Sequence, residues 1–186
     1  MVKTIDLIRQ NTEQTNIGDI LDFFQLMHKS ENMKIVGDRL YSKIKRNCIV
    51  DHIRDSYDVI GAVNVEGLVL ATLLGSKSYY PKGMCNTFAK DFPYGSKVLP
   101  ERSVGGRNVL LTTGIITDGY DCIDSMRTVI MNGGTPVHIA TVVDYDKNFN
   151  FGKGTAKERI MSHYNEGDAR IDFGVSALVK ESDLDL

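Results

Sequence analysis

The middle of the chain alternates short, β-branched apolar runs with segments of helical character. Residues 58–65, 108–113 and 137–144 each read as a strand that is apolar along most of its length. Runs of this kind are typical of strands that are buried on both faces, as in parallel sheets. Residues 68–75 and 122–131 lie between them and read as helices. This order predicts an α/β protein built on a parallel sheet.

The composition fits a folded globular protein and excludes several other classes. The chain has 186 residues, which corresponds to one domain at roughly 100–200 residues per domain. Hydrophobic residues make up 42% and charged residues 25%, which excludes a disordered chain. The net charge of -2 gives no basic excess, so bulk nucleic-acid binding is not expected. The longest apolar stretch, residues 67–75, is too short to span a membrane.

The opening residues and the cysteines predict a cytoplasmic protein. The sequence begins without the apolar segment of a signal peptide. Cys48, Cys85 and Cys122 are odd in number and widely spaced, so they read as reduced thiols, with Cys122 a buried structural one. His138 falls in an expected strand and reads as a structural histidine.

The remaining segments are expected to surround the sheet. Residues 17–29 place apolar side chains at helical spacing and predict a helix, with Asn16 as its N-cap. Residues 34–41 read as a short extended segment that is broken at a Gly-Asp turn. Tyr79-Tyr80 indicates a further strand, and residues 171–179 indicate an edge strand.

Three loops follow expected strands and are the places where a ligand would bind. They are residues 64–67, 82–106 and 113–121. In parallel sheets, ligands bind outside the carboxyl ends of the strands. The loop at 82–106 is long for a compact domain, which is typical of a functional segment.

The strand and loop that begin at Val109 carry a motif, with the sequence VLLTTGIITDGYD. This segment resembles the signature of the type I phosphoribosyltransferases. In that family an apolar strand runs into two adjacent acids, two apolar residues and a Thr/Gly-rich loop that opens a helix. The resemblance covers about residues 57–146 and is closest to the orotate phosphoribosyltransferases.

The resemblance implies a fold and a domain organisation. The implied fold is an α/β Rossmann-like parallel sheet flanked by helices, with a small N-terminal hood subdomain. The implied domain is a single phosphoribosyltransferase-like unit over residues 1–186, with its core at about 57–146. Residues 1–56 would add an N-terminal helix and strand, and residues 147–186 would be C-terminal additions.

The resemblance also implies an activity. It is a glycosyltransferase reaction of nucleotide metabolism, and of pyrimidine biosynthesis in the orotate enzymes. Phosphoribose passes from phosphoribosyl pyrophosphate to a base, with Mg²⁺ carried on the pyrophosphate. Lys82 and Lys90 resemble catalytic lysines of the family's basic mobile loop, which neutralise the leaving pyrophosphate. Glu66 and Gly67 resemble the pyrophosphate loop, and the family's usual assembly implies a homodimer.

The paired acids of the motif are replaced in this chain. In the family they accept hydrogen bonds from the ribose hydroxyls, and here they would fall at Thr113 and Gly114. Thr113 offers one neutral hydrogen bond, and Gly114 has no side chain. Charge-assisted hydrogen bonds are worth about 1.5–3 kcal/mol each, so the loss of two costs roughly 3–6 kcal/mol. The motif therefore predicts an impaired transferase.

The phosphate loop of the motif is altered as well. Thr117 and Gly119 fit a loop that holds a 5′-phosphate at a helix N-terminus. Asp118 and Asp121 bring negative charge to the same loop. A carboxylate ~6 Å from one phosphate charge repels it by about 2–3 kcal/mol at an effective dielectric constant of ~20. Asp121 has a second interpretation as the cap of the following helix.

Three functions remain open at this point. The first is an impaired phosphoribosyltransferase related to the orotate enzymes. The second is a non-catalytic nucleotide-binding, regulatory or partner-binding protein on the same scaffold, because a fold does not fix a function. The third is an enzyme with a changed substrate, in which Asp118 and Asp121 face a cation or a metal.

Overall fold

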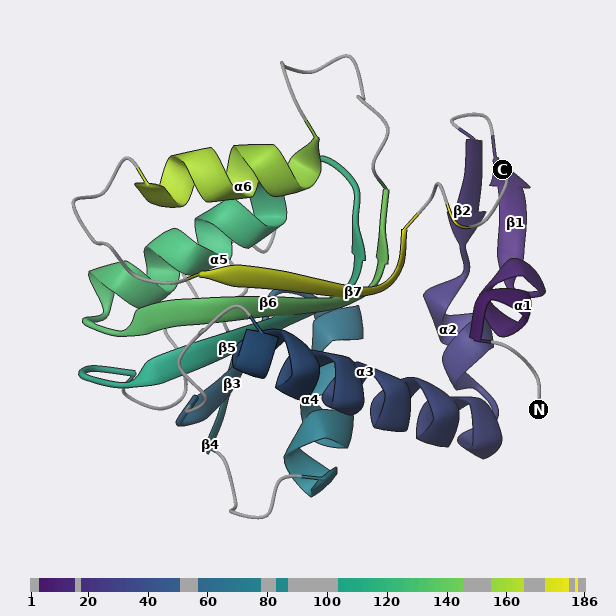
Figure 1. Cartoon of the computed structure of the whole chain (residues 1–186), viewed down its shortest axis with the longest axis horizontal. Coiled ribbons are helices and arrows are strands. Elements are labelled where there is room, and N and C mark those ends of the chain that lie inside the picture. Colours follow the sequence, from purple (N-terminus) through teal and green to yellow (C-terminus); the bar gives the residue numbers. More distant parts are fainter. Residues whose placement is uncertain are drawn as a thin grey trace, which may run out of the picture.

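A parallel sheet of five strands forms the centre of the protein (Figure 1). The fold is taken from a computed structural model that describes residues 4–15, 18–50, 57–77, 83–86, 104–145, 155–165, 173–180 and 183. The strand order is β4-β3-β5-β6-β7, and each neighbouring pair is parallel. The strands are β3 (Val59–Ala62), β4 (Gly83–Asn86), β5 (Asn108–Ile116), β6 (Thr135–Asp144) and β7 (Gly174–Lys180).

Helices cover both faces of the sheet, which gives the fold three layers (Figure 1). Helices α3 (Ser30–Val50) and α4 (Val65–Lys77) lie on one face. Helices α5 (Tyr120–Met131) and α6 (Ala156–Asn165) lie on the other. Two separate clusters of buried apolar residues hold these layers together, one on each side of the sheet. The α/β class and the parallel sheet flanked by helices are confirmed.

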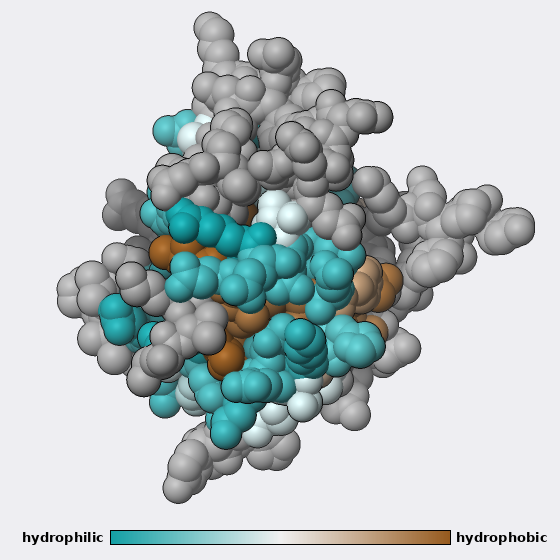
Figure 2. Space-filling view, turned by 90° about the vertical axis from the view of Figure 1, so that its right-hand side faces the viewer, coloured by the Kyte–Doolittle hydropathy of each residue, from teal (hydrophilic) through white to brown (hydrophobic). Residues whose placement is uncertain are grey.

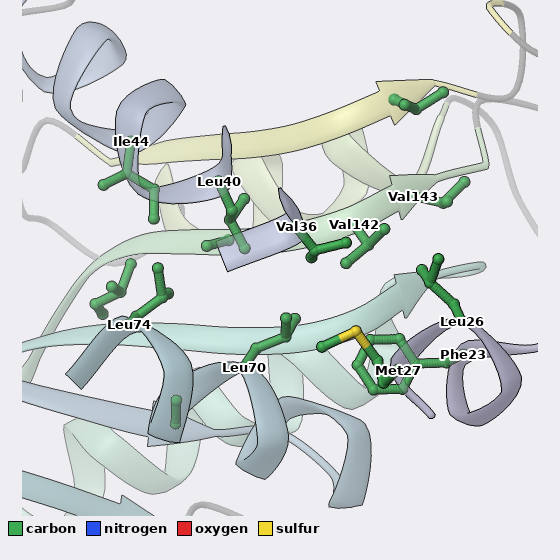
Figure 3. Close-up of a cluster of buried hydrophobic side chains, with 14 of the residues drawn as sticks. Phe23, Leu26, Met27, Val36, Leu40, Ile44, Leu70, Leu74, Val142 and Val143 are labelled. Atoms are coloured by element: carbon green, nitrogen blue, oxygen red, sulfur yellow. The ribbon is translucent and has the colours of Figure 1, made fainter. Parts of the chain in front are cut away.

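The larger apolar cluster shows how α3 and α4 are held against the sheet (Figure 3). Val36, Leu40 and Ile44 follow one another at four-residue spacing along α3 and are buried. They share this cluster with Leu70 and Leu74 of α4, which are also fully buried. Side chains four apart lie on one face of a helix, so this face of α3 is its buried face.

The N-terminal segment lies beyond the carboxyl ends of the sheet strands (Figure 1). It consists of α1 (Thr4–Arg9), the antiparallel pair β1 (Thr12–Thr15) and β2 (Gly18–Leu21), and α2 (Phe23–Met27). Buried residues of α1 and α2 belong to the same apolar cluster as α3 and α4. The segment therefore packs on the main body at the edge where the sequence predicts ligand binding.

The strands expected over residues 58–65, 108–113, 137–144 and 171–179 and the helix after the motif are confirmed, with shifted ends. β5 continues to Ile116 instead of ending at residue 113, and α5 begins at Tyr120, two residues earlier than expected. That helix ends at Met131, Asn132 is its C-cap, and Gly133 follows with φ 76°. β7 forms the expected strand at an edge of the sheet. The single-domain organisation stays a prediction.

The helix expected over residues 17–29 is wrong in its first half. Residues 18–21 form β2, which pairs with β1. The helix begins only at Phe23, because the Asp22 carboxylate accepts the Gln25 N–H at 2.8 Å and caps its first turn. The spacing places Phe24 and Met27 on the buried face, but Phe24 is exposed while Phe23 and Met27 are buried. Asn16 and Ile17 lie outside the described residues.

The extended segment expected over residues 34–41 is also wrong, because it is the middle of α3. The Gly-Asp pair read as a turn is helical. Gly37 is buried against α4, where an added Cβ would lie 2.8 Å from Lys77 Cε. Asp38 is exposed and pairs with Lys77 of α4. The four-residue spacing of buried residues outweighs the local turn preference here.

Two further expectations are corrected near the carboxyl edge of the sheet. Glu66 and Gly67 lie in the first turn of α4 and not in a turn that precedes the helix. The segment 82–106, expected to be one long loop, contains β4 at Gly83–Asn86. Tyr79-Tyr80, Lys82 and Lys90 lie outside the described residues.

In the part of the chain that the structure describes, no helix is both long enough and apolar enough to cross a membrane.

Gly67 is predicted to be the position in α4 that least tolerates a side chain. A Cβ there would overlap the Thr112 carbonyl oxygen of β5. We expect Gly67→Ala to lower the free energy of unfolding by about 3 kcal/mol or more, because α4 must move away from the sheet. Urea denaturation followed by circular dichroism measures this loss.

Gly106→Ala is the matched control for that measurement. Gly106 has φ 70°, and no atom lies within 4 Å of an added Cβ. This control should cost only the backbone strain, about 1–2 kcal/mol. Equal losses for the two variants would contradict the close approach of α4 to β5.

Candidate functional site

The carboxyl ends of β3 and β5 face the amino ends of α4 and α5 at one edge of the sheet (Figure 1). We call Asn64, Glu66, Gly67 and residues 113–121 the carboxyl-edge site. On the side of the molecule where the N-terminal elements lie, hydrophilic residues make up most of the described surface, with hydrophobic ones between them (Figure 2).

Asn64 joins the start of α4 to β5. Its Oδ1 accepts the Gly67 N–H at 2.8 Å, and its Nδ2 donates to Thr113 Oγ1 at 3.1 Å. The first bond caps α4 in the manner of an N-cap side chain. It also means that the Gly67 N–H is already bonded and is not directed at a ligand.

The Thr113 hydroxyl both donates and accepts a hydrogen bond within the chain. It is buried, its hydroxyl donates to the Ile115 carbonyl at 3.0 Å, and the same oxygen accepts from Asn64. The position of the first family acid is therefore a structural hydrogen-bonding residue here.

Two side chains occupy the space in which a residue other than glycine would carry its Cβ at position 114. A Cβ at this position would overlap a carboxylate oxygen of Glu66, and it would lie 2.7 Å from Phe23 Cδ2 and 2.8 Å from Glu66 Cβ. α4 supplies the carboxylate and α2 supplies the ring. The space in which a side chain at residue 114 would begin is thus occupied by Glu66 and Phe23.

Glu66 is a half-buried carboxylate, and no cation among the described residues pairs with it. Among the described residues, no hydrogen bond or ion pair reaches its side chain. Burial raises the pKa of the Glu66 carboxyl above its ordinary value, and the negative charge of Asp22 raises that pKa further. Both causes disfavour the ionised form, so in the free protein its charge is held at a cost in folding free energy.

The amino end of α5 holds the phosphate-loop residues of the motif. Gly119 has φ 81° and precedes the helix, and an added Cβ there would lie 3.0 Å from Ile160 of α6. Asp118 Oδ1 accepts the Tyr120 N–H at 3.1 Å, while Thr117 is exposed. The Asp118 carboxylate therefore lies at the helix end where the motif predicts a phosphate.

Asp121 lies in the first turn of α5 and is not its N-cap, so the capping interpretation is wrong. The N-cap is Gly119, which makes no side-chain cap bond. Arg159 of α6 reaches the same loop, where its Nε donates to the Asp118 carbonyl at 3.0 Å. An arginine beside this loop places one positive charge near Asp118.

The buried histidine and cysteine have the structural settings expected from the sequence. Burial lowers the pKa of His138 to about 4, with a smaller effect of Lys157, and its Nε2 lies 2.7 Å from Ser176 Oγ. Ser176 also accepts from Asn47 of α3 at 2.6 Å. Burial raises the pKa of the Cys122 thiol, so it is a poor nucleophile.

The structure describes seven predicted site residues, which are Glu66, Gly67, Thr113, Thr117, Asp118, Gly119 and Asp121. It places Glu66 and Gly67 of α4 against the end of β5, where Thr113 lies, and it places the other four at the start of α5. Sequence reasoning missed Asn64, Asp22, Phe23 and Arg159. An Asn three residues before Gly67 is a recognisable capping signal, but nothing in the sequence places Phe23 or Arg159 near the motif.

The described residues contain no group of three or more His, Cys, Asp or Glu side chains that could hold a metal ion. Asp118 and Asp121 alone supply too few ligands for such a site.

Comparisons with known proteins identify the fold. No protein-family model matches the sequence, and no curated protein matches it. Among solved structures, orotate phosphoribosyltransferase of Mycobacterium tuberculosis H37Rv in complex with 5-phospho-alpha-D-ribosyl 1-diphosphate has a TM-score of 0.66 at 19% identity. This match covers 98% of this chain and 97% of that one.

Two further structures support the same fold. A phosphoribosyltransferase from Corynebacterium diphtheriae has a TM-score of 0.70 at 15% identity, with 98% and 96% of the two chains covered. Adenine phosphoribosyltransferase from Thermoanaerobacter pseudethanolicus has a TM-score of 0.63 at 12% identity, with 95% and 99% covered. The chain therefore has the type I phosphoribosyltransferase fold that the motif implies.

Glu66→Gln is predicted to stabilise the free protein at neutral pH. The raised pKa means that the folded state binds a proton more readily than the unfolded state, so ionised Glu66 destabilises the fold above that pKa. The amide keeps the shape and removes the charge. We expect a higher melting temperature than wild type at pH 7, and a gain that shrinks as the pH falls towards the ordinary value of 4.5.

Exposed Glu31 of α3 provides the matched control for these melting curves. Glu31→Gln makes the same chemical change without burial and should leave the melting temperature nearly unchanged. A Glu66→Gln variant less stable than wild type at pH 7 would contradict the unfavourable charge.

Proposed function

We propose that this chain binds a phosphoribosyl ligand at the carboxyl-edge site and transfers phosphoribose from phosphoribosyl pyrophosphate to a nitrogenous base. The main support is that the matches to solved phosphoribosyltransferases span nearly the whole of both chains, and one of those structures is a complex with phosphoribosyl pyrophosphate. The motif loop between β5 and α5 lies at the matching place, the carboxyl edge of a parallel sheet. Orotate is the first base to test, which would place the protein in pyrimidine biosynthesis.

The proposed transfer is slow compared with an enzyme that has an intact acidic pair. Thr113 is buried and bonded within the chain, and Gly114 has no side chain. The two charge-assisted hydrogen bonds that stabilise the ribose in the family are therefore missing from β5. Loss of these bonds weakens transition-state stabilisation by roughly 3–6 kcal/mol, which lowers the rate by about two to four orders of magnitude.

Other parts of the proposal concern groups around this site. Mg²⁺ would enter bound to the pyrophosphate, since this ion is commonly held by substrate phosphates. Lys82 and Lys90 would neutralise that pyrophosphate during transfer. We further propose a homodimer in the cytoplasm.

A second candidate is a non-catalytic nucleotide-binding or regulatory protein on this scaffold. Asp118 favours it, because its carboxylate already bonds to the Tyr120 N–H at the amino end of α5. A phosphate at that place would have to displace or face a like charge. Such a change weakens a site for phosphoribosyl pyrophosphate without altering the fold.

Thermal denaturation with a set of ligands separates the two candidates. Ligands at ~100 times the dissociation constant should add about 2.7 kcal/mol to the free energy of unfolding and raise the melting temperature by a few degrees. We expect this shift with phosphoribosyl pyrophosphate plus Mg²⁺, and with ribose 5-phosphate. A transferase assay with orotate and purine bases follows.

The outcome of that ligand set decides between the candidates. A shift with nucleoside monophosphates alone would favour the non-catalytic protein. The absence of any shift would overturn phosphoribosyl binding at the carboxyl-edge site.

Asp118→Asn is predicted to strengthen phosphate binding. The amide oxygen still accepts the Tyr120 N–H, while the negative charge is removed. Relief of about 2–3 kcal/mol of repulsion corresponds to roughly 30- to 150-fold tighter binding of ribose 5-phosphate, measured by isothermal titration calorimetry. Asp124→Asn, which removes one charge farther along α5, is the control and should change the affinity only slightly. Equal effects of the two substitutions would show that net charge, not the loop, controls binding.

A further inference from the structure

We infer that Glu66 supplies, from α4, the carboxylate that receives the sugar hydroxyls of a phosphoribosyl ligand, in place of an acid at residue 114. The inference rests on the proposed function, that such a ligand binds at the carboxyl-edge site. It assigns the Glu66 side chain a role different from the pyrophosphate contact that the resemblance implies for Glu66 and Gly67.

The geometry over Gly114 is the first support. A Cβ at residue 114 would overlap the Glu66 carboxylate. An acid at residue 114 would begin where the carboxylate of Glu66 now lies, so the two positions deliver a negative charge to the same region. The charge reaches it from α4 instead of β5.

The hydrogen bonds of the neighbouring polar groups are the second support. Asp22 accepts the Gln25 N–H, Asn64 bonds to Gly67 and Thr113, and Thr113 bonds to Ile115. Glu66 has no such bond to any described residue. Of these four side chains, Glu66 is the one with its full capacity for accepting hydrogen bonds.

The chemistry of that carboxylate indicates the class of group it takes. An ionised carboxylate accepts hydrogen bonds only, and two adjacent hydroxyls can donate to its two oxygens. Among the described residues, no lysine or arginine contacts it, and Asp22 adds a like charge. A ligand that brings hydroxyl donors therefore gives this group the partners that the described residues do not.

The rival interpretation is that Glu66 only fills the space beside Phe23. Glutamine has nearly the same shape and would fill it equally well. A structural role therefore predicts that Glu66→Gln leaves ligand affinity unchanged, whereas the inferred role predicts a loss that depends on the hydroxyls of the ligand.

The test measures the affinity of wild type, Glu66→Gln and the control Glu31→Gln for ribose 5-phosphate and for 2-deoxyribose 5-phosphate, by isothermal titration calorimetry. We expect wild type and the control to prefer ribose 5-phosphate. Glu66→Gln should bind ribose 5-phosphate about 10- to 100-fold more weakly, since charge-assisted hydrogen bonds become neutral ones, and should lose most of the preference over the deoxy sugar. Glu66→Asp retains the charge and should keep part of that preference.

Each outcome has one meaning. If wild type binds ribose 5-phosphate and Glu66→Gln binds it equally well with the same preference, the role of Glu66 is overturned while the proposed function stands. If wild type binds neither sugar phosphate, both are overturned. Circular dichroism and melting curves verify that each variant is folded, and Glu66→Met, which also keeps the volume and removes the charge, replaces Glu66→Gln if the latter does not fold.

Discussion

The close approach of α4 to β5 is the contact on which the rest of the site depends. Gly67 lies so near the Thr112 carbonyl that no side chain fits between helix and strand. Asn64 fixes the same junction by capping α4 and bonding to Thr113. These contacts set where the first turn of α4 stands, and therefore where the carboxylate of Glu66 comes to lie over Gly114. A wider gap would separate that carboxylate from the edge of the sheet.

The sheet was predictable from the sequence because both of its faces are buried. β3 is buried at all four positions, and β6 at nine of ten, so each is apolar along most of its length. The N-terminal segment gave no such signal. Residues 18–21 are held as a strand by pairing with β1, and the Gly-Asp pair of α3 is held in a helix by packing of Val36, Leu40 and Ile44. These outcomes depend on contacts between distant segments, which local spacing does not encode.

The residues of the site also divide into those that the sequence predicts and those that it does not. The motif located Thr113, Gly114 and the loop at 117–121, because their order along one strand and helix start is visible in the chain. The side-chain contact of Glu66 with Gly114 could not be found that way. It joins residues 48 positions apart, and it exists because α4 crosses the end of β5. Arg159 also lies far from the loop in the sequence, and α6 brings it to the Asp118 carbonyl.

The overlap above Gly114 makes two positions interdependent. An acidic side chain at residue 114 and a glutamate at residue 66 would place two negative charges in one partly buried space, where like charges raise each other's pKa and each disfavours the ionised form. A chain with neither acid would lack a carboxylate there altogether. A substitution at one of these residues therefore changes the effect of a substitution at the other. A path of single substitutions from this arrangement to one with an acid on β5 passes through a protein that has both acids or neither. Gly114 and Glu66 therefore constrain each other's identity, although Gly114 lies on β5 and Glu66 lies on α4.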